Sequence, residues 1–294
     1  MQTLTQKRVF GTKFGTTEVF VASETGLIGV TVSADQIGEF GLAHRGPVHA
    51  VAVEDRGVLL GTDEDVLHSE RDQESDDTAT AQSRTFSSVT AEPFGQCVAV
   101  GWGPTGPVAA DDDGRVAGVD REHDTDPDWT TLGETEGVRA VDGELIAAAD
   151  GVYRLSDAEI HHVGLDNVRD VAGHGTPLAA TADGLFGLGN GWLPLQDGAF
   201  DCVGSDGHGH AHAVGPAGLV RRAGGADSVV DGSWESDELP VGSPVVDVDY
   251  GSGIVAAITA DGTLCVEAGD GWRHQLLGVQ KVSEVAVGPG QPDE

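Results

Sequence analysis

Short runs of small and apolar residues recur along the chain, and each is broken by Asp-Gly or a similar pair before apolar residues resume. Six copies lie at residues 59–67, 109–116, 147–153, 179–186, 213–220 and 257–264. This pattern predicts two strands joined by a tight turn, because the turn needs a positive φ that glycine adopts at little cost. A repeat of thirty to fifty residues that holds several strands is typical of a β-propeller.

A second repeat precedes each hairpin, and a third follows it. The preceding segments have apolar residues three apart, as expected for the innermost strand of a blade, and lie at 48–51, 95–98, 138–141, 168–171, 200–203, 245–248 and 282–287. The following segments are more polar and often aromatic, and lie at 37–40, 86–89, 129–132, 160–163, 192–195, 234–236 and 272–276. Four of the five tryptophans fall in these outer segments, whereas Trp102 is expected in a turn after an inner strand.

The unmatched ends of the pattern predict how the ring closes. The last inner segment, 282–287, has no hairpin after it, and the first hairpin, 19–30, has no inner segment before it. The two complete one unit, so the sequence predicts an all-β, seven-bladed β-propeller of four-stranded antiparallel blades, the first closed by the C-terminal strand. Six or eight blades are the alternatives. We expect a single domain over 1–294, with a disordered insertion at 69–83 and a flexible tail at 289–294.

The charge of the chain is strongly negative. The formal net charge is −33, with 49 acidic and 16 basic residues, and only three residues are lysine. Many carboxylates with few lysines are typical of proteins that stay soluble in multimolar salt, where screening removes the repulsion between like charges. We therefore expect a halophilic protein. A functional acidic surface for a basic partner is the alternative.

The composition also narrows the classes of partner. Direct nucleic-acid binding is not expected, because no basic stripe is present to neutralise phosphates. No apolar stretch approaches the length of a membrane span, and no secretory signal is visible, so we expect a soluble, cytoplasmic monomer. Three widely spaced cysteines, Cys97, Cys202 and Cys265, lie in strand-like contexts and are expected to be reduced and buried.

Several stretches are similar to those of a known protein family. They lie at 38–46, 149–154, 163–171 and 188–192, and the similarity extends over nearly the whole chain. The chain resembles a family of seven-unit β-propeller proteins of haloarchaea, and more distantly sialidase-type and WD40-like propellers. The resemblance implies the fold but no activity, cofactor or catalytic residue. The two tyrosines, Tyr153 and Tyr250, lie at repeat positions that fit structural roles better than that of a sialidase nucleophile.

Charged residues gather at the second and third positions of the predicted inner strands. These strands line the central channel of a propeller, where ligands commonly bind. The candidate ligand-binding residues at the channel mouth are His49, Arg139, Arg169, Asp170, Asp201, Asp247 and Glu284. Cations on one arc and carboxylates on the other would suit a zwitterion, a small anion or a peptide. Ion pairs between neighbouring blades, with no ligand, are the alternative interpretation.

Histidines at alternate positions suggest a weaker candidate, a metal site. His208, His210 and His212 would point to one side of an extended strand, and His174 aligns with His208 one repeat earlier. The flanking glycines favour a loop instead, and no carboxylate stands at a characteristic ligand spacing.

The sequence favours a non-enzymatic scaffold without a cofactor that binds a protein or peptide. No nucleophile elbow, zinc-protease helix or phosphate-binding loop is present. The alternative is a hydrolase or lyase acting on a small sugar or lactone, with or without a metal, in which channel carboxylates such as Asp170, Asp247 and Glu284 serve as acid, base or metal ligands. An enzyme should have a deep channel pocket with a perturbed carboxylate, and a scaffold should have an exposed apolar patch.

Overall fold

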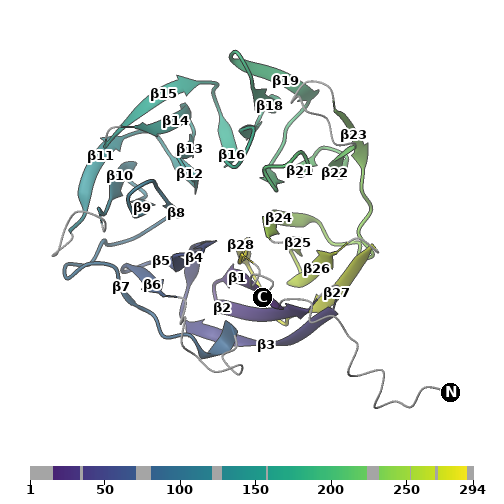
Figure 1. Cartoon of the computed structure of the whole chain (residues 1–294), viewed down its shortest axis with the longest axis horizontal. Coiled ribbons are helices and arrows are strands. Elements are labelled where there is room, and N and C mark those ends of the chain that lie inside the picture. The colour runs from purple at the N-terminus through teal and green to yellow at the C-terminus, as the bar shows by residue number, and fades with distance from the viewer. Residues whose placement is uncertain are drawn as a thin grey trace.

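The computed structural model describes residues 16–33, 36–70, 81–120, 128–156, 158–223, 232–251, 253–268 and 271–289. They form seven four-stranded antiparallel sheets arranged as a ring (Figure 1). The seven-bladed β-propeller predicted from the sequence is confirmed. Within the described ranges, no helix is long and apolar enough to cross a membrane.

Each blade runs from an inner strand at the ring centre to an outer strand at the rim. In blade order, the inner strands are β28 (Val282–Val287), β4 (Val48–Glu54), β8 (Ala99–Trp102), β12 (Val138–Asp142), β16 (Val168–Ala172), β20 (Cys202–Ser205) and β24 (Val245–Gly251). The second strands are β1 (Thr16–Ser23), β5 (Gly57–Thr62), β9 (Pro107–Ala110), β13 (Leu145–Ala148), β17 (Leu178–Thr181), β21 (Ala211–Gly215) and β25 (Ile254–Thr259). The third strands are β2 (Gly26–Ser33), β6 (Val66–Ser69), β10 (Arg115–Gly118), β14 (Gly151–Ser156), β18 (Gly184–Leu188), β22 (Gly218–Ala223) and β26 (Thr263–Glu267). The outer strands are β3 (Gln36–Arg45), β7 (Ser87–Ser88), β11 (Thr130–Glu134), β15 (Glu159–Gly164), β19 (Trp192–Asp197), β23 (Ser233–Ser236) and β27 (Trp272–Leu276).

The ring closes within blade one. The C-terminal strand β28 pairs antiparallel with β1, from Val19 opposite Val287 to Ser23 opposite Val282. Blade one therefore takes three strands from the start of the fold and its inner strand from the end, as the sequence predicts. Closure pairs β1 on both sides and leaves the ring without an open end.

The hydrophobic core lies between consecutive blades. One cluster joins Val19 and Val21 of blade one to Ile258 and Leu264 of blade seven, all of them buried. The second strands are rich in alanine, and Ala109, Ala147 and Ala179 are wholly buried among the strands that surround them. Small side chains suit these positions because the sheets converge towards the ring axis.

The turn glycines allow close approach as well as a positive φ. Gly114, in the turn between β9 and β10, has φ +94°, and a Cβ there would lie 1.9 Å from the carbonyl oxygen of Thr135. Gly262, between β25 and β26, has φ +79°, and a Cβ there would lie 2.4 Å from the carbonyl oxygen of Val279. In both blades, the backbone that leaves the outer strand passes directly over the hairpin turn.

Blade three differs from the sequence prediction. Its inner strand is 99–102 and not 95–98, because Cys97 N–H bonds to Thr62 of the preceding blade before the ladder with β9 is established. Trp102 accordingly lies in the inner strand β8 and is buried, not in a turn. Its ring packs under the guanidinium of Arg56, 4.8 Å from the ring centroid, and edge-on against His68.

The two ends of the disordered insertion predicted over 69–83 are structured, which corrects the prediction there. Ser69 is the last residue of β6, and Ala81–Ser83 forms a short 3₁₀ helix whose Ala81 is wholly buried beside Gly29. Residues 71–80 lie outside the described residues, as do residues 290–294 of the predicted tail. The three cysteines are free and buried, as predicted.

Candidate functional site

The central channel is a cavity of about 1460 Å³ lined by residues from all seven inner strands. Its lining holds nine carboxylates but only three arginines among the described residues. Carboxylates deep in the channel are Asp170, Asp247 and Glu284, and others lie where inner strands end, such as Glu54 and Asp142. The cavity is therefore an acidic, cation-attracting space.

The structure divides the seven candidate residues into two groups. Asp170, Asp247 and Glu284 line the cavity. The other four, His49, Arg139, Arg169 and Asp201, lie at or just before the beginning of their inner strands and do not contribute to its lining. The arc of cations predicted at the mouth is therefore not part of this cavity.

The channel carboxylates bond to the backbone of the next blade. Asp170 accepts the N–H of Val203 at 2.8 Å, and Asp247 accepts the N–H of Val285 at the same distance. Each of the two also accepts the N–H of the residue that follows it, at 2.8 Å. These bonds join neighbouring inner strands, so Asp170 and Asp247 contact the backbone of the next blade.

Burial of these carboxyl groups favours their protonated form. Burial, and after it the charge of Asp247, raises the pKa of Asp170 and of Glu284. Burial likewise raises the pKa of Asp247, although its two backbone hydrogen bonds oppose the shift. Asp249, which the sequence analysis did not select, accepts the N–H of Val287 at 2.7 Å, and burial raises its pKa to about 7.

The other four candidate residues each form a hydrogen bond or an ion pair within the protein. Arg139 Nη1 donates to the carbonyl of Val168 in the next blade at 2.8 Å. Arg169 forms an ion pair with Asp201, again in the next blade. His49 Nε2 lies 2.6 Å from Asp63 Oδ1 of its own blade. Contacts of these kinds fit the alternative, structural interpretation of the charges.

Three of the four candidate metal ligands lie on loops where inner strands end. His174 Nδ1 lies 3.3 Å from Asp142 Oδ1, and that hydrogen bond and charge raise the pKa of His174 to about 9. His208 and His210 both bond to Asp206 within their own loop. The two loops touch, because a Cβ on Gly175 would lie 2.2 Å from the carbonyl oxygen of Gly207. The His174 and His208 loops therefore lie side by side, with Asp142 and Asp206 as the partners of the histidines.

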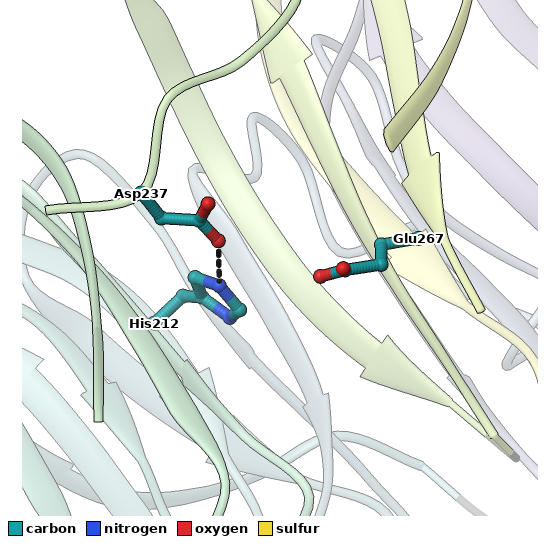
Figure 2. Close-up of side chains that lie close together, drawn as sticks. All are labelled: His212, Asp237 and Glu267. Carbon is teal, nitrogen blue, oxygen red and sulfur yellow. Dashed lines mark hydrogen bonds and ion pairs between the residues drawn. The ribbon is translucent and has the colours of Figure 1, made fainter. Parts of the chain in front are cut away.

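The fourth histidine, His212, belongs to a different group. It lies on β21, its Nε2 is 2.9 Å from Asp237 Oδ2, and its Nδ1 contacts the Tyr250 hydroxyl. Trp272 Nε1 also donates to Asp237 Oδ2, at 3.3 Å. Glu267 on β26 completes a set in which one ligand atom each from His212, Asp237 and Glu267 lies within 4.8 Å of the others (Figure 2). No sequence pattern points to the two carboxylates, because 25 and 55 residues separate them from the histidine.

Comparisons with known proteins agree with the fold. A family model described as HVO_0234-like, beta propeller, matches residues 3–288. Among solved structures, the chain is similar to U3-55K, with TM-score 0.64 and 12% identity over 92% of this chain and 95% of that chain. It is also similar to the WD40 β-propeller domain of Doa1, with TM-score 0.60 and 14% identity over 81% of this chain and 85% of that chain. For human WBSCR16, the TM-score is 0.54 and the identity 15%, over 86% of this chain and 88% of that chain. No curated protein matches the sequence.

Proposed function

The chain belongs to the HVO_0234-like β-propeller family, and we propose that it is a non-enzymatic scaffold that holds a protein or peptide partner at the mouth of its central channel. As its setting we propose the cytoplasm of a salt-rich cell, which the net charge of −33 supports.

The charge imbalance of the channel carries this proposal. Among the described residues, nine carboxylates line the cavity against three arginines, and mutual repulsion contributes to the raised pKa values of Asp170 and Glu284. A lysine or arginine side chain entering the channel would relieve that repulsion. We therefore infer that the partner presents a basic segment.

The strand ends supply the contact surface. Glu54, Asp142, Asp206 and Asp249 come from four different blades and all line the cavity. Glu54 and Asp142 lie where β4 and β12 end, and Asp206 lies in the loop after β20, so a segment crossing the mouth would meet these three, whereas Asp249 lies deeper, within β24. Rigid inner strands hold these side chains in place, which keeps the entropic cost of binding low.

To test the proposal, the purified full chain is used to capture its partner in multimolar KCl, and mass spectrometry identifies the captured protein. Glu54→Gln combined with Asp142→Asn should reduce capture at least tenfold. A control that removes the same charge, Asp112→Asn with Asp113→Asn in the β9–β10 turn, should leave it unchanged. Equal capture by both double variants would place the partner elsewhere on the ring and overturn the proposal.

One observation favours a second candidate, a hydrolase or lyase acting on a small sugar or lactone. Raised pKa values of channel carboxyls, such as Asp249 at about 7, are typical of general acids. The backbone hydrogen bonds of the same groups favour a structural role. Turnover of a lactone or glycoside panel that is lost in Asp249→Asn, with the fold intact, would favour the enzyme over the scaffold.

A further inference from the structure

Three potential metal ligands converge between blades six and seven. His212 comes from β21, Asp237 from the segment directly after β23, and Glu267 from β26. Figure 2 shows the carboxylate of Glu267 directed across the gap towards the imidazole and the carboxylate of Asp237. One atom of each lies within 4.8 Å of the others, so small side-chain movements would bring all three to the ~2.0–2.2 Å ligand distances of one zinc ion.

His212 is held as a metal-binding histidine would be. Its side chain is only 6% exposed, and the Tyr250 hydroxyl fixes Nδ1 while Nε2 faces the two carboxylates. In the neutral ring without metal, Nε2–H donates to Asp237, and Nδ1 accepts from the tyrosine. A hydroxyl can donate or accept, so the ring can move its proton to Nδ1 and free the Nε2 lone pair without losing that contact.

Contacts among the described residues do not explain the position of the Glu267 carboxylate. Its carboxylate is half-buried, and among the described residues no hydrogen bond or ion pair holds it. Asp237, by contrast, accepts from both His212 and Trp272. Two carboxylates this close repel each other, and Arg221, the cross-strand neighbour of His212, offsets only part of that charge. A divalent cation would neutralise the pair.

We propose that His212, Asp237 and Glu267 bind one divalent first-row transition-metal ion, with an open coordination position towards the central cavity. One imidazole nitrogen and two carboxylate oxygens form a donor set suited to such ions. His212 and Glu267 line the cavity, which gives the ion a path to the site. The ion would tie blade six to blade seven through side chains from both.

Calorimetric titration of Zn²⁺ into the metal-free full chain tests the proposal. The titration is done in multimolar KCl with excess Mg²⁺. These hard cations prefer oxygen ligands, so they should occupy the surface carboxylates and leave the site that contains the imidazole nitrogen to Zn²⁺. We expect one equivalent to bind and Glu267→Gln, an isosteric change, to weaken binding at least tenfold. Co²⁺ should give visible absorption bands that are lost in the same variant.

Two controls separate this site from other histidines and carboxylates. The first control is Glu235→Gln, which changes an exposed carboxylate on the neighbouring strand β23. The second is His208→Ala with His210→Ala, which removes two histidines from the loop between β20 and β21 at the mouth. Both variants should bind Zn²⁺ as the original protein does. Absence of saturable binding overturns the proposal, since the group is then a hydrogen-bond network only. Binding that survives Glu267→Gln but is lost in the mouth variant also overturns it.

Discussion

The carboxylate of Glu284 accepts a hydrogen bond of 2.7 Å from the backbone N–H of Val51, a residue 233 positions earlier in the chain. The bond crosses from the C-terminal inner strand β28 of blade one to β4 of blade two. Asp247 and Asp170 make the equivalent bond to the next inner strand, at Val285 and Val203. Inner-strand carboxylates therefore link the blades beside the axis, where the sheets make no backbone ladder with each other.

Glu284→Ala should destabilise the ring more than Glu284→Gln. Alanine leaves the Val51 N–H without an acceptor in the protein, which costs about 1–3 kcal/mol. Glutamine keeps an acceptor oxygen and, like the protonated carboxyl that burial favours, carries no charge, so the free energy of unfolding of this variant should stay within about 1 kcal/mol of the original. Denaturant unfolding at constant high salt measures both. Equal losses of unfolding free energy in the two variants would show that stability does not depend on the hydrogen bond that Glu284 accepts.

Stability should fall as the pH rises from about 4 to about 7. The folded-state pKa of Asp249 is raised to about 7 from an ordinary value of 3.8, so the folded protein holds the proton more tightly than the unfolded chain. The stabilisation that this proton gives is complete below the lower value and is lost as the pH passes through the upper one. Each such group contributes a slope of up to about 1.4 kcal/mol per pH unit. Below pH 4, groups with lowered pKa values such as Asp150 act in the opposite direction.

Asp249→Asn provides the control for this pH dependence. Its amide oxygen can still accept the Val287 N–H, but the side chain no longer titrates. The slope of unfolding free energy against pH between 4 and 7 should become shallower in the variant. An unchanged slope would mean that Asp249 ionises in the folded protein much as it does in the unfolded chain.

Gly114→Ala and Gly218→Ala should separate two reasons for glycine in the hairpin turns. Both positions have nearly the same positive φ, +94° and +98°, so both alanines incur about 1–2 kcal/mol of backbone strain. At Gly218 nothing lies within 4 Å of the new Cβ, whereas at Gly114 the Thr135 carbonyl would be 1.9 Å away. Gly114→Ala should therefore cost about 1–3 kcal/mol more. Thermal unfolding of the two variants measures the difference, and equal losses would contradict the close approach.

Much of this fold could be predicted because each blade repeats the same local pattern. The closure by 282–287 followed from two unmatched ends, and strand pairing between β28 and β1 confirms it. Blade three was misplaced because Cys97 and Val98 have the expected apolar spacing but bond to Thr62 and to Ala110 ahead of the strand. Local spacing alone does not reveal where a ladder begins.

The sites could be predicted only in part. Sequence repeats aligned Asp170, Asp247 and Glu284 on inner strands, and all three line the channel. The same alignment could not tell which of two consecutive residues lines the cavity, so Arg169 is grouped with Asp170 although only Asp170 belongs to the lining. The ligand set around His212 was missed because β21, the end of β23 and β26 meet only through packing of blade six against blade seven.

Arg139→Ala with Arg169→Ala should leave ligand binding in the channel unchanged. Neither residue lines the cavity, and their partners are the Val168 carbonyl and Asp201 of adjoining blades. Since the Arg169–Asp201 pair is largely exposed, its loss should cost less than about 1 kcal/mol. Capture assays and denaturant unfolding of the double variant check both expectations. Loss of anionic ligand binding with normal stability would restore these arginines as binding residues.

Stability should increase steeply with KCl concentration. A net charge of −33 on 294 residues creates strong repulsion, and the screening length falls from ~10 Å at 0.1 M salt to ~3 Å at 1 M. Thermal unfolding across a KCl series should show a midpoint that rises with salt concentration. Asp112→Asn with Asp113→Asn removes two exposed charges from one turn, so it should raise the midpoint in low salt and leave it unchanged in high salt. A midpoint that does not depend on KCl would show that the carboxylates do not limit stability, and would favour the alternative of an acidic surface kept for a basic partner.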